Sequence, residues 1–327
     1  SSAILLYGMV LVYGFTGSSQ LDQIGASVTA QGINSSPALI LGLVLITAGF
    51  GFKISAVPFH MWAPDVYEGA PTPVVGFLSV ASKAAGFAVI LRVFYTAFGI
   101  DSFNMDWAYL IAILSALSMS VGNLIAIRQE NIKRMLAYST IAQAGYLMVG
   151  LASVTALQGS AGFGADKAGP SGVLFYLAGY AMTNLTAFSV IIAISNKTNS
   201  DMINSFAGLA RKSPLMATAM TLSMISLIGI PPTVGFMAKI YIFGAAMDTG
   251  LWWLAMIGVI NSVVSAYYYL RVVKVMFISE DSDPSPIRPD IGAALAAVLG
   301  TVATLAFGLY PTPIIEFAYR AVNTIIS

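Results

Sequence analysis

Three lysines lie inside hydrophobic stretches of this 327-residue chain, and proton transfer is the chemistry they could perform. Lys53, Lys83 and Lys239 each stand among apolar residues, where a charged amine costs about 2.5–3.5 kcal/mol on membrane-insertion scales. A lysine buried without a counter-charge can bind and release a proton at physiological pH, whereas an arginine stays charged. The alternative, chiefly for Lys53, is that the ammonium snorkels to the membrane surface. The spacing and residue type favour a proton path through these lysines.

Prolines interrupt two of the three lysine-bearing stretches. Lys53 precedes Pro58 in the chain, and Lys239 follows the pair Pro231 and Pro232. Proline removes a helical hydrogen bond, and carbonyl groups freed within a membrane must be satisfied by protein or by cavity water. Broken helices beside ionisable groups mark ion sites in many transporters, so we expect two broken helices at the site. A kink that serves packing alone is the alternative.

The inventory of other reactive side chains is short. Cysteine is absent, and His60 is the single histidine, which excludes disulfides, thiolate zinc sites, ordinary iron–sulfur ligation and a bis-histidine haem within this chain. His60 lies two turns past Lys53 with Pro58 between them, so it is a candidate relay residue, with a local hydrogen bond at the break as the alternative. We expect no metal, cofactor or redox centre in this chain.

The elements that position these residues are predicted to be membrane-spanning helices. Hydrophobic residues make up 57% of the chain and charged residues 9%, against about 25% charged residues in soluble domains. The net charge of +1 does not indicate binding to nucleic acid. Loops are expected at 18–36, 157–171 and 196–213. Apolar runs of spanning length predict an all-α, polytopic membrane protein with about nine transmembrane helices, at about 3–17, 37–64, 75–98, 107–127, 135–156, 172–195, 214–247, 251–277 and 291–318.

Basic residues are distributed unequally between the two sides that alternating spans define. The loops at 65–74, 128–134, 196–213 and 271–290 fall on one side. They hold Arg128, Lys133, Arg134, Lys197, Arg211, Lys212, Arg271, Lys274 and Arg288, against Arg92, Lys167 and Arg320 on the other. The positive-inside rule therefore makes the first side cytoplasmic and places the C-terminus on the outer side.

Counter-charges for the three lysines are missing from the spans. All fourteen acidic residues fall in loops or near span ends. The partner charges are therefore lacking, supplied by an upstream part of the protein, or supplied by another subunit. The chain begins at Ser1, with a hydrophobic run from Ala3 and no initiator Met or charged leader, so we expect upstream helices to be absent from this sequence.

A weak internal repeat relates the two halves of the chain. Lys83 lies nine residues before Arg92, Ser262 lies nine before Arg271, and both arginines stand in a Leu-Arg-Val triplet. By the side assignment, the two copies cross the membrane in opposite directions, which is typical of inverted-topology repeats. The pattern predicts three parts: 1–104 as the remainder of a first repeat, 105–277 as a second inverted repeat, and 278–327 as a C-terminal transmembrane helix and tail.

Three long motifs carry a family resemblance that covers essentially the whole chain. They are FKISAVPFHMWAPDVYEGAPTPVVGFLSVASK at 52–83, GNLIAIRQENIKRMLAYSTIAQAGYLMVG at 122–150 and GIPPTVGFMAKIYIF at 229–243. The chain resembles the antiporter-like membrane subunits of NADH:quinone oxidoreductase (respiratory complex I), most of all the subunit N, or chain 2, branch. The resemblance implies two inverted repeats, each with a broken helix, and lysines along a hydrated mid-membrane axis. It also implies an essential glutamate and a further lysine in helices upstream of this chain.

The resemblance implies a role for each lysine in a proton-translocating subunit, which acts as part of an H⁺-translocating enzyme. The family's broken-helix lysine matches Lys53, expected to be a switch, and its next-helix lysine matches Lys83, expected to be the relay. Its second broken-helix lysine matches Lys239, expected to be the terminal site. Quinone reduction in partner subunits would drive the movement. NAD, FMN, iron–sulfur clusters and quinone are expected in those partners.

The expected surroundings follow from the same resemblance. The partners are other membrane subunits, the peripheral redox subunits indirectly, and the lipid bilayer of a bacterial plasma (inner) membrane, with a thylakoid or organelle membrane as the alternative. Two related functions stay open: a subunit of a multisubunit cation/proton antiporter, and a subunit of a ferredoxin-dependent photosynthetic or hydrogenase relative of complex I. A structural membrane subunit without an ion path is the alternative from another class.

Overall fold

The computed structural model describes residues 1–31, 36–98, 104–154, 168–279 and 285–326. Within these ranges the chain folds into helices and forms no strand. The first group of elements is α1 (Ser2–Thr16), α2 (Leu21–Gln31), α3 (Pro37–Ile54), α4 (Trp62–Gly69), α5 (Thr72–Phe77), the π-helical turn η2 (Leu78–Ser82), α6 (Lys83–Arg92), the π-helical turn η3 (Val93–Ala97), α7 (Asn104–Ala126) and α8 (Ile132–Ala152). The second group is α9 (Ala168–Thr198), the 3₁₀ turn η5 (Ile203–Phe206), α10 (Leu209–Lys212), α11 (Pro214–Ile228), α12 (Val234–Asp248), α13 (Trp252–Ile278), α14 (Ile291–Leu309) and α15 (Thr312–Ile326).

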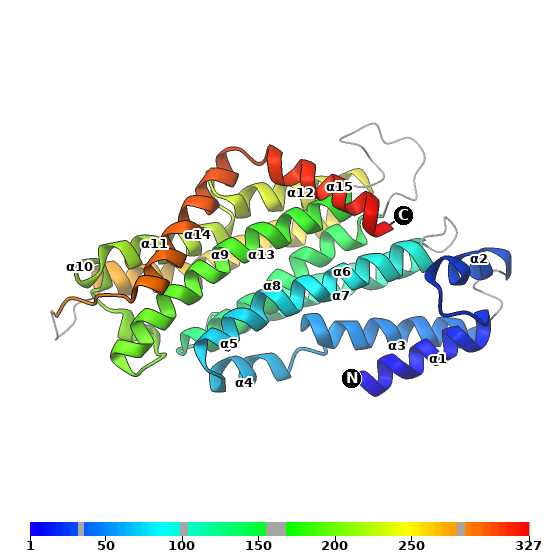
Figure 1. The fold of residues 1–327 in the computed structure, drawn as a ribbon, viewed down its shortest axis with the longest axis horizontal. Helices are drawn as coiled ribbons and strands as arrows, with labels where there is room; N and C mark the ends of the chain where they lie inside the picture. Colours follow the sequence, from blue (N-terminus) through cyan, green and yellow to red (C-terminus); the bar gives the residue numbers. More distant parts are fainter. Residues whose placement is uncertain (32–35, 99–103, 155–167, 280–284, 327) are drawn as a thin grey trace.

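The long helices run side by side along one axis of the molecule and form a bundle (Figure 1). Seven helices of the described residues are long and apolar enough to cross a membrane, and counting the pair α1 and α2, bent by 57°, as one span gives eight. The predicted total of about nine differs for physical reasons. α1 has only 15 residues, and the seventh predicted span is divided into α11 and α12, of 15 residues each.

Two predicted boundaries are corrected by the structure. The stretch 18–36, predicted as a loop, contains the helix α2. The ninth predicted span ends earlier, because α14 stops at Leu309 and α15 begins separately at Thr312, after Tyr310 and Pro311. Of the predicted loop 157–171, the part up to 167 lies outside the described residues, and α9 begins at Ala168.

Contacts gather the four basic loops at one end of the bundle, as the alternation of spans predicts. Asn131 and Met202 form an antiparallel β-bridge, and the backbone N–H of Ile287 donates to the carbonyl of Lys212. Arg134 binds residues of α4. In Figure 1, α4 and α10 lie at this end, whereas α2 and the C-terminus lie at the opposite end. The predicted grouping is confirmed, and its cytoplasmic orientation stays a prediction.

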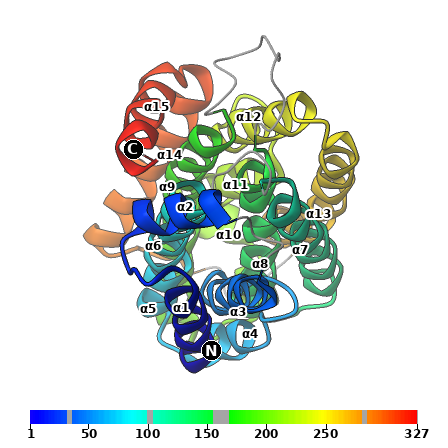
Figure 2. The same cartoon turned by 90° about the vertical axis from the view of Figure 1, so that its right-hand side faces the viewer.

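α8 is the central helix of the bundle. Its span is 94% buried, whereas that of the peripheral α14 is 17% buried, and Figure 2 shows α8 surrounded by other helices. α7 packs on α8 so closely that a Cβ on Gly145 would lie 2.7 Å from the backbone nitrogen of Met119 and 3.0 Å from the carbonyl oxygen of Ser115. Small residues permit this approach, which is the usual way in which membrane helices pack tightly.

Both predicted helix breaks are present. α3 ends before Ser55, which has a φ of 60°, and α11 ends before Gly229, which has a φ of 89°. Two side chains satisfy backbone groups at the first break: the indole nitrogen of Trp62 donates to the carbonyl of Phe52 at 3.0 Å, and the hydroxyl of Ser118 on α7 accepts from the backbone N–H of Val57 at 2.9 Å. α3 and α11 cross the bundle in opposite directions (Figure 1), which favours the predicted inverted repeat, whose boundaries stay a prediction.

Adding one methyl group at each of two glycines should therefore distinguish the effect of close packing on stability from the effect of helix propensity. Gly244 lies exposed on α12, and a Cβ added there would meet nothing within 4 Å, so Gly244→Ala should stabilise the helix by about 0.5–1 kcal/mol. Gly145→Ala should instead destabilise the protein by about 1–3 kcal/mol through overpacking against α7. Thermal unfolding of the purified full-length protein in detergent measures both changes. A rise in melting temperature for both variants would contradict the close contact between α7 and α8 at Gly145.

Candidate functional site

Lys83 is buried in the bundle and bound by a backbone carbonyl. It begins α6 directly after the π-helical turn η2, a type of helix distortion that is frequent at functional sites. Its side chain is 2% exposed, and Nζ donates to the carbonyl of Thr140 on α8 at 2.5 Å. In the preceding turn, the hydroxyl of Ser79 accepts from the amide nitrogen of Asn184 on α9 at 2.6 Å. The prediction that Lys83 lies inside the bundle agrees with the structure.

Lys239 is held by the second helix break itself. Its side chain on α12 is 5% exposed, and Nζ donates to the carbonyls of Ile228 at 2.7 Å and Leu227 at 3.3 Å, the last two residues of α11. It also donates to the hydroxyl of Ser262 at 2.9 Å and lies 4.3 Å from the ring centre of Tyr146. Ser262 is the residue that the internal repeat matches to Lys83.

The end of α11 is suited to a cation for a simple reason. The last four carbonyl groups of a helix lack intrahelical partners, and they carry the negative end of the helix dipole. Because α11 stops at Ile228 within the bundle, its free carbonyls are buried, and the Lys239 amine satisfies two of them. A face of an aromatic ring adds a further favourable contact for a cation. The break therefore supplies neutral oxygen ligands where a carboxylate would otherwise be needed.

Ion pairs among the described residues lie away from Lys83 and Lys239. They are Lys133–Asp201 at 2.8 Å, Arg134–Asp65 at 2.8 Å and Arg134–Glu68 at 2.7 Å. All three join the loops and helix ends at the basic end of the bundle. In the part of the chain that the structure describes, the two buried lysines therefore have no acidic partner, and neutral groups take that place.

Lys53 and His60 are placed differently from the other two lysines. Lys53 lies on the last turn of α3, and its side chain is exposed, with no hydrogen bond or ion pair to any described residue. His60 is buried in the break, and its Nδ1 has no partner among the described residues. No hydrogen bond joins the two side chains in this part of the chain. The roles of Lys53 as a switch and of His60 as a relay stay predictions.

A network of neutral polar side chains, which the sequence analysis missed, connects the surroundings of the two buried lysines. Gln143 on α8 accepts from the hydroxyl of Tyr176 on α9, and its Nε2 donates to the carbonyl of Leu227 at 3.3 Å. The same nitrogen lies 3.5 Å from the hydroxyl of Tyr269 on α13, which in turn pairs with Ser139. A signal was present in the sequence, because the polar residues of α8 recur at helical spacing: Ser139, Thr140, Gln143 and Tyr146.

Lys133 is a third buried lysine, which the sequence analysis placed in a basic loop. It lies at the start of α8, is 5% exposed, pairs with Asp201, and donates to the carbonyl of Ala70 at 3.1 Å. Its carboxylate partner distinguishes it from Lys83 and Lys239. Lys133 therefore ties the end of α4 and the loop after α9 to the central helix.

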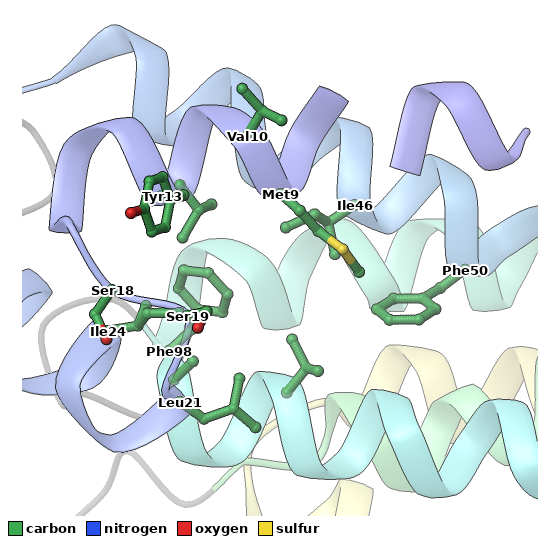
Figure 3. Close-up of a pocket in the computed structure, with 13 residues that line it drawn as sticks. Met9, Val10, Tyr13, Ser18, Ser19, Leu21, Ile24, Ile46, Phe50 and Phe98 are labelled. Carbon is green, nitrogen blue, oxygen red and sulfur yellow. The ribbon is translucent and has the colours of Figure 1, made fainter. Parts of the chain in front are cut away.

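The cavity in Figure 3 is separate from the lysines. It has a volume of about 330 Å³ and lies between α1, α2, α3 and η3, lined by Met9, Val10, Val12, Tyr13, Ser18, Ser19, Leu21, Ile24, Ile46, Phe50, Val93, Ala97 and Phe98. This lining is almost wholly apolar. The described residues contain no group of three or more His, Cys, Asp or Glu side chains that could hold a metal ion.

Comparisons with known proteins agree on one family. The family model described as "NADH:quinone oxidoreductase/Mrp antiporter, TM" matches residues 1–265. NADH-quinone oxidoreductase subunit N of Desulforamulus reducens is 49% identical over 326 residues, covering 100% of this chain and 65% of the relative. The same subunit of Heliobacterium modesticaldum is 47% identical, covering 99% and 65%. The chain thus spans about 65% of the length of these curated relatives.

Solved structures show the same fold. A chain of respiratory complex I from Thermus thermophilus with bound aureothin matches with 37% identity and a TM-score of 0.77, covering 96% of this chain and 65% of that one. A chain of an archaeal membrane-bound sulfane sulfur reductase matches with 28% identity and a TM-score of 0.86, covering 100% and 63%. A chain of the Mrp complex from Dietzia, at 24% identity and a TM-score of 0.85, covering 100% and 66%, shares the fold.

Gly229 offers a test of how the break seats Lys239. A Cβ at Gly229 would lie 2.8 Å from Cδ of Lys239, and its φ of 89° is unfavourable for other residues. Gly250 has a φ of 79° but nothing within 4 Å of a Cβ, so Gly250→Ala carries the backbone strain alone. We expect Gly229→Ala to cost about 1–3 kcal/mol more stability than Gly250→Ala, because of the added clash. Equal losses of stability in the two variants, measured by thermal unfolding, would contradict the placement of the Lys239 side chain against Gly229.

Proposed function

The chain belongs to the NADH:quinone oxidoreductase/Mrp antiporter family of transmembrane subunits, and from this premise we propose that it moves protons across the membrane through a relay of buried lysines. Its place would be the proton-translocating membrane subunit of a complex I-type NADH:quinone oxidoreductase. The observation that carries the proposal is the Lys239 amine, buried at the end of a broken helix and bound by neutral oxygens.

Neutral ligands suit an amine that must gain and lose a proton. A carboxylate partner favours the charged lysine and opposes its deprotonation. Carbonyl and hydroxyl oxygens accept hydrogen bonds from both the ammonium and the neutral amine, so neither protonation state is left without partners. Lys239 has such ligands in Leu227, Ile228 and Ser262. Lys83 has the carbonyl of Thr140. This argument supports proton exchange at both lysines.

We assign the three lysines consecutive roles. Lys53 would be the switch, since its exposed side chain at the first break can be reached by a charged group outside the described residues. Lys83 would be the relay inside the bundle, and Lys239 would be the terminal site that exchanges its proton with one side of the membrane. His60 would assist at the first break.

The driving reaction would lie in other chains. Quinone reduction in partner subunits, which hold NAD, FMN, iron–sulfur clusters and quinone, would change the charge state along the lysines. This chain would contribute no redox centre of its own. Its neighbours would be other membrane subunits, with the peripheral redox subunits acting indirectly. The relatives named subunit N come from bacteria, which supports a location in the bacterial plasma membrane.

A multisubunit cation/proton antiporter is the second candidate, favoured by the family description, which also names Mrp antiporters. The ligands around Lys239 argue for protons rather than sodium. A cation such as Na⁺ would have to displace the Lys239 amine to reach the carbonyls of Leu227 and Ile228. Sodium-independent proton uptake would support the first candidate.

Substitution of the buried lysines tests the proposed function. In the assembled complex in proteoliposomes, Lys83→Ala and Lys239→Ala should each lower NADH-driven proton uptake by about tenfold or more, because a proton-transfer group is lost. Lys239→Arg should be equally impaired, because arginine stays protonated. Lys274→Ala is the matched control, since Lys274 is exposed on α13. Unchanged proton uptake per NADH in both alanine variants, with normal assembly, would leave only a structural role for this chain.

A further inference from the structure

Lys83 and Lys239 both contact α8. Lys83 donates to the carbonyl of Thr140, and Lys239 lies against the ring of Tyr146, which is six residues further along the same helix. Gln143 lies between these two positions on the helix and is 2% exposed. The amide of Gln143 thus lies along α8 between the residue that binds Lys83 and the residue that contacts Lys239.

Gln143 binds a group from each of three other helices. Its oxygen accepts from the hydroxyl of Tyr176 on α9, and its nitrogen donates to the carbonyl of Leu227 on α11. The nitrogen also approaches the hydroxyl of Tyr269 on α13 at 3.5 Å. A buried amide with both its oxygen and its nitrogen engaged has a fixed orientation, since rotating it would leave polar atoms unsatisfied.

The carbonyl of Leu227 is shared between Gln143 and Lys239. Each donates to it at 3.3 Å, and the Lys239 amine makes its shorter bond, 2.7 Å, with the next carbonyl, that of Ile228. A charged donor makes a stronger hydrogen bond than a neutral amide. While Lys239 is protonated, it competes with Gln143 for this oxygen. When Lys239 is neutral, the oxygen is available for a stronger bond from Gln143.

The other partners of Gln143 lead to Lys83. Tyr269 pairs with the hydroxyl of Ser139, the residue before Thr140, whose carbonyl binds Lys83. On α9, Tyr180 lies one turn from Tyr176 and pairs with the hydroxyl of Thr140 at 2.9 Å. Polar side chains of two helices, α13 and α9, therefore connect the surroundings of Gln143 with those of Thr140, whose carbonyl binds Lys83.

We propose that Gln143 is a positioning residue that couples the proton occupancy of Lys239 to that of Lys83, through the shared Leu227 carbonyl and the hydroxyls of Tyr176 and Tyr269. This inference rests on the proposed proton relay. The amide does not itself carry the proton, because it has no group that titrates at physiological pH. It orients the donors and acceptors around both lysines, so that the two amines change state together.

The test removes the hydrogen bonds of Gln143 while keeping its size. Gln143→Met in the assembled complex in proteoliposomes should lower the ratio of protons taken up to NADH oxidised by about threefold or more, the range of a coupling interaction of this kind. Gln143→His, which retains a donor and an acceptor, should restore much of that ratio, and a residue that only fills space would show no such rescue. Gln129→Met is the matched control, since Gln129 is half-buried just after α7 and its side chain donates to the carbonyl of Ile125.

Hydroxyl deletions keep the test decisive should Gln143→Met fail to assemble. Tyr176→Phe removes the donor to the Gln143 oxygen, and it should also lower the ratio. Tyr95→Phe removes a hydroxyl that donates to the carbonyl of Leu151 at 3.0 Å, away from both lysines, and it should not. Wild-type ratios in Gln143→Met and Tyr176→Phe, with Lys239→Ala impaired, would overturn the coupling and leave the relay standing. Wild-type proton uptake in Lys239→Ala would overturn the relay itself.

Discussion

The cost of keeping an ammonium group inside a membrane is the constraint on which this structure depends. A lysine at that depth needs oxygen ligands, and a continuous helix offers few, because most of its carbonyls are already bonded within the helix. The chain meets this need by ending α11 within the bundle, so that the carbonyls of Leu227 and Ile228 bind Lys239. Gly229 makes the arrangement possible, since its positive φ ends the helix and its missing side chain leaves room for the lysine stem.

The rest of the bundle keeps these groups in register around α8. This helix is almost wholly buried, presents the carbonyl that binds Lys83, and carries Gln143 and Tyr146 beside Lys239. Close packing at Gly145 fixes α7 against it. At the basic end, Lys133 and Arg134 tie α4 and the loop after α9 to its first turn. Among the described residues, the charged pairs thus lie at the end of the bundle, and neutral ligands bind the lysines of the interior.

The features that could be predicted from the sequence are those that carry a free-energy penalty inside a membrane. A lysine among apolar residues and a proline inside a span each carry a penalty, so the burial of Lys83 and Lys239 and both helix breaks were predictable. Neutral polar residues cost less and can face any direction, so the network around Gln143 needed the three-dimensional arrangement. Lys133 was misplaced because it stands at the border between loop and helix. The exposure of Lys53 depends on neighbours that periodicity does not reveal.

Infrared spectroscopy of the α11 carbonyls tests the central claim most directly. The full-length protein would be prepared with isoleucine labelled with ¹³C at the carbonyl, and its spectrum compared with that of the Lys239→Met variant. If the Lys239 amine binds the carbonyl of Ile228, as its 2.7 Å separation indicates, one labelled carbonyl band should move to higher frequency when the amine is removed. Labelled bands that coincide in the two spectra would contradict the account, because the broken helix would then not be the ligand of the buried lysine.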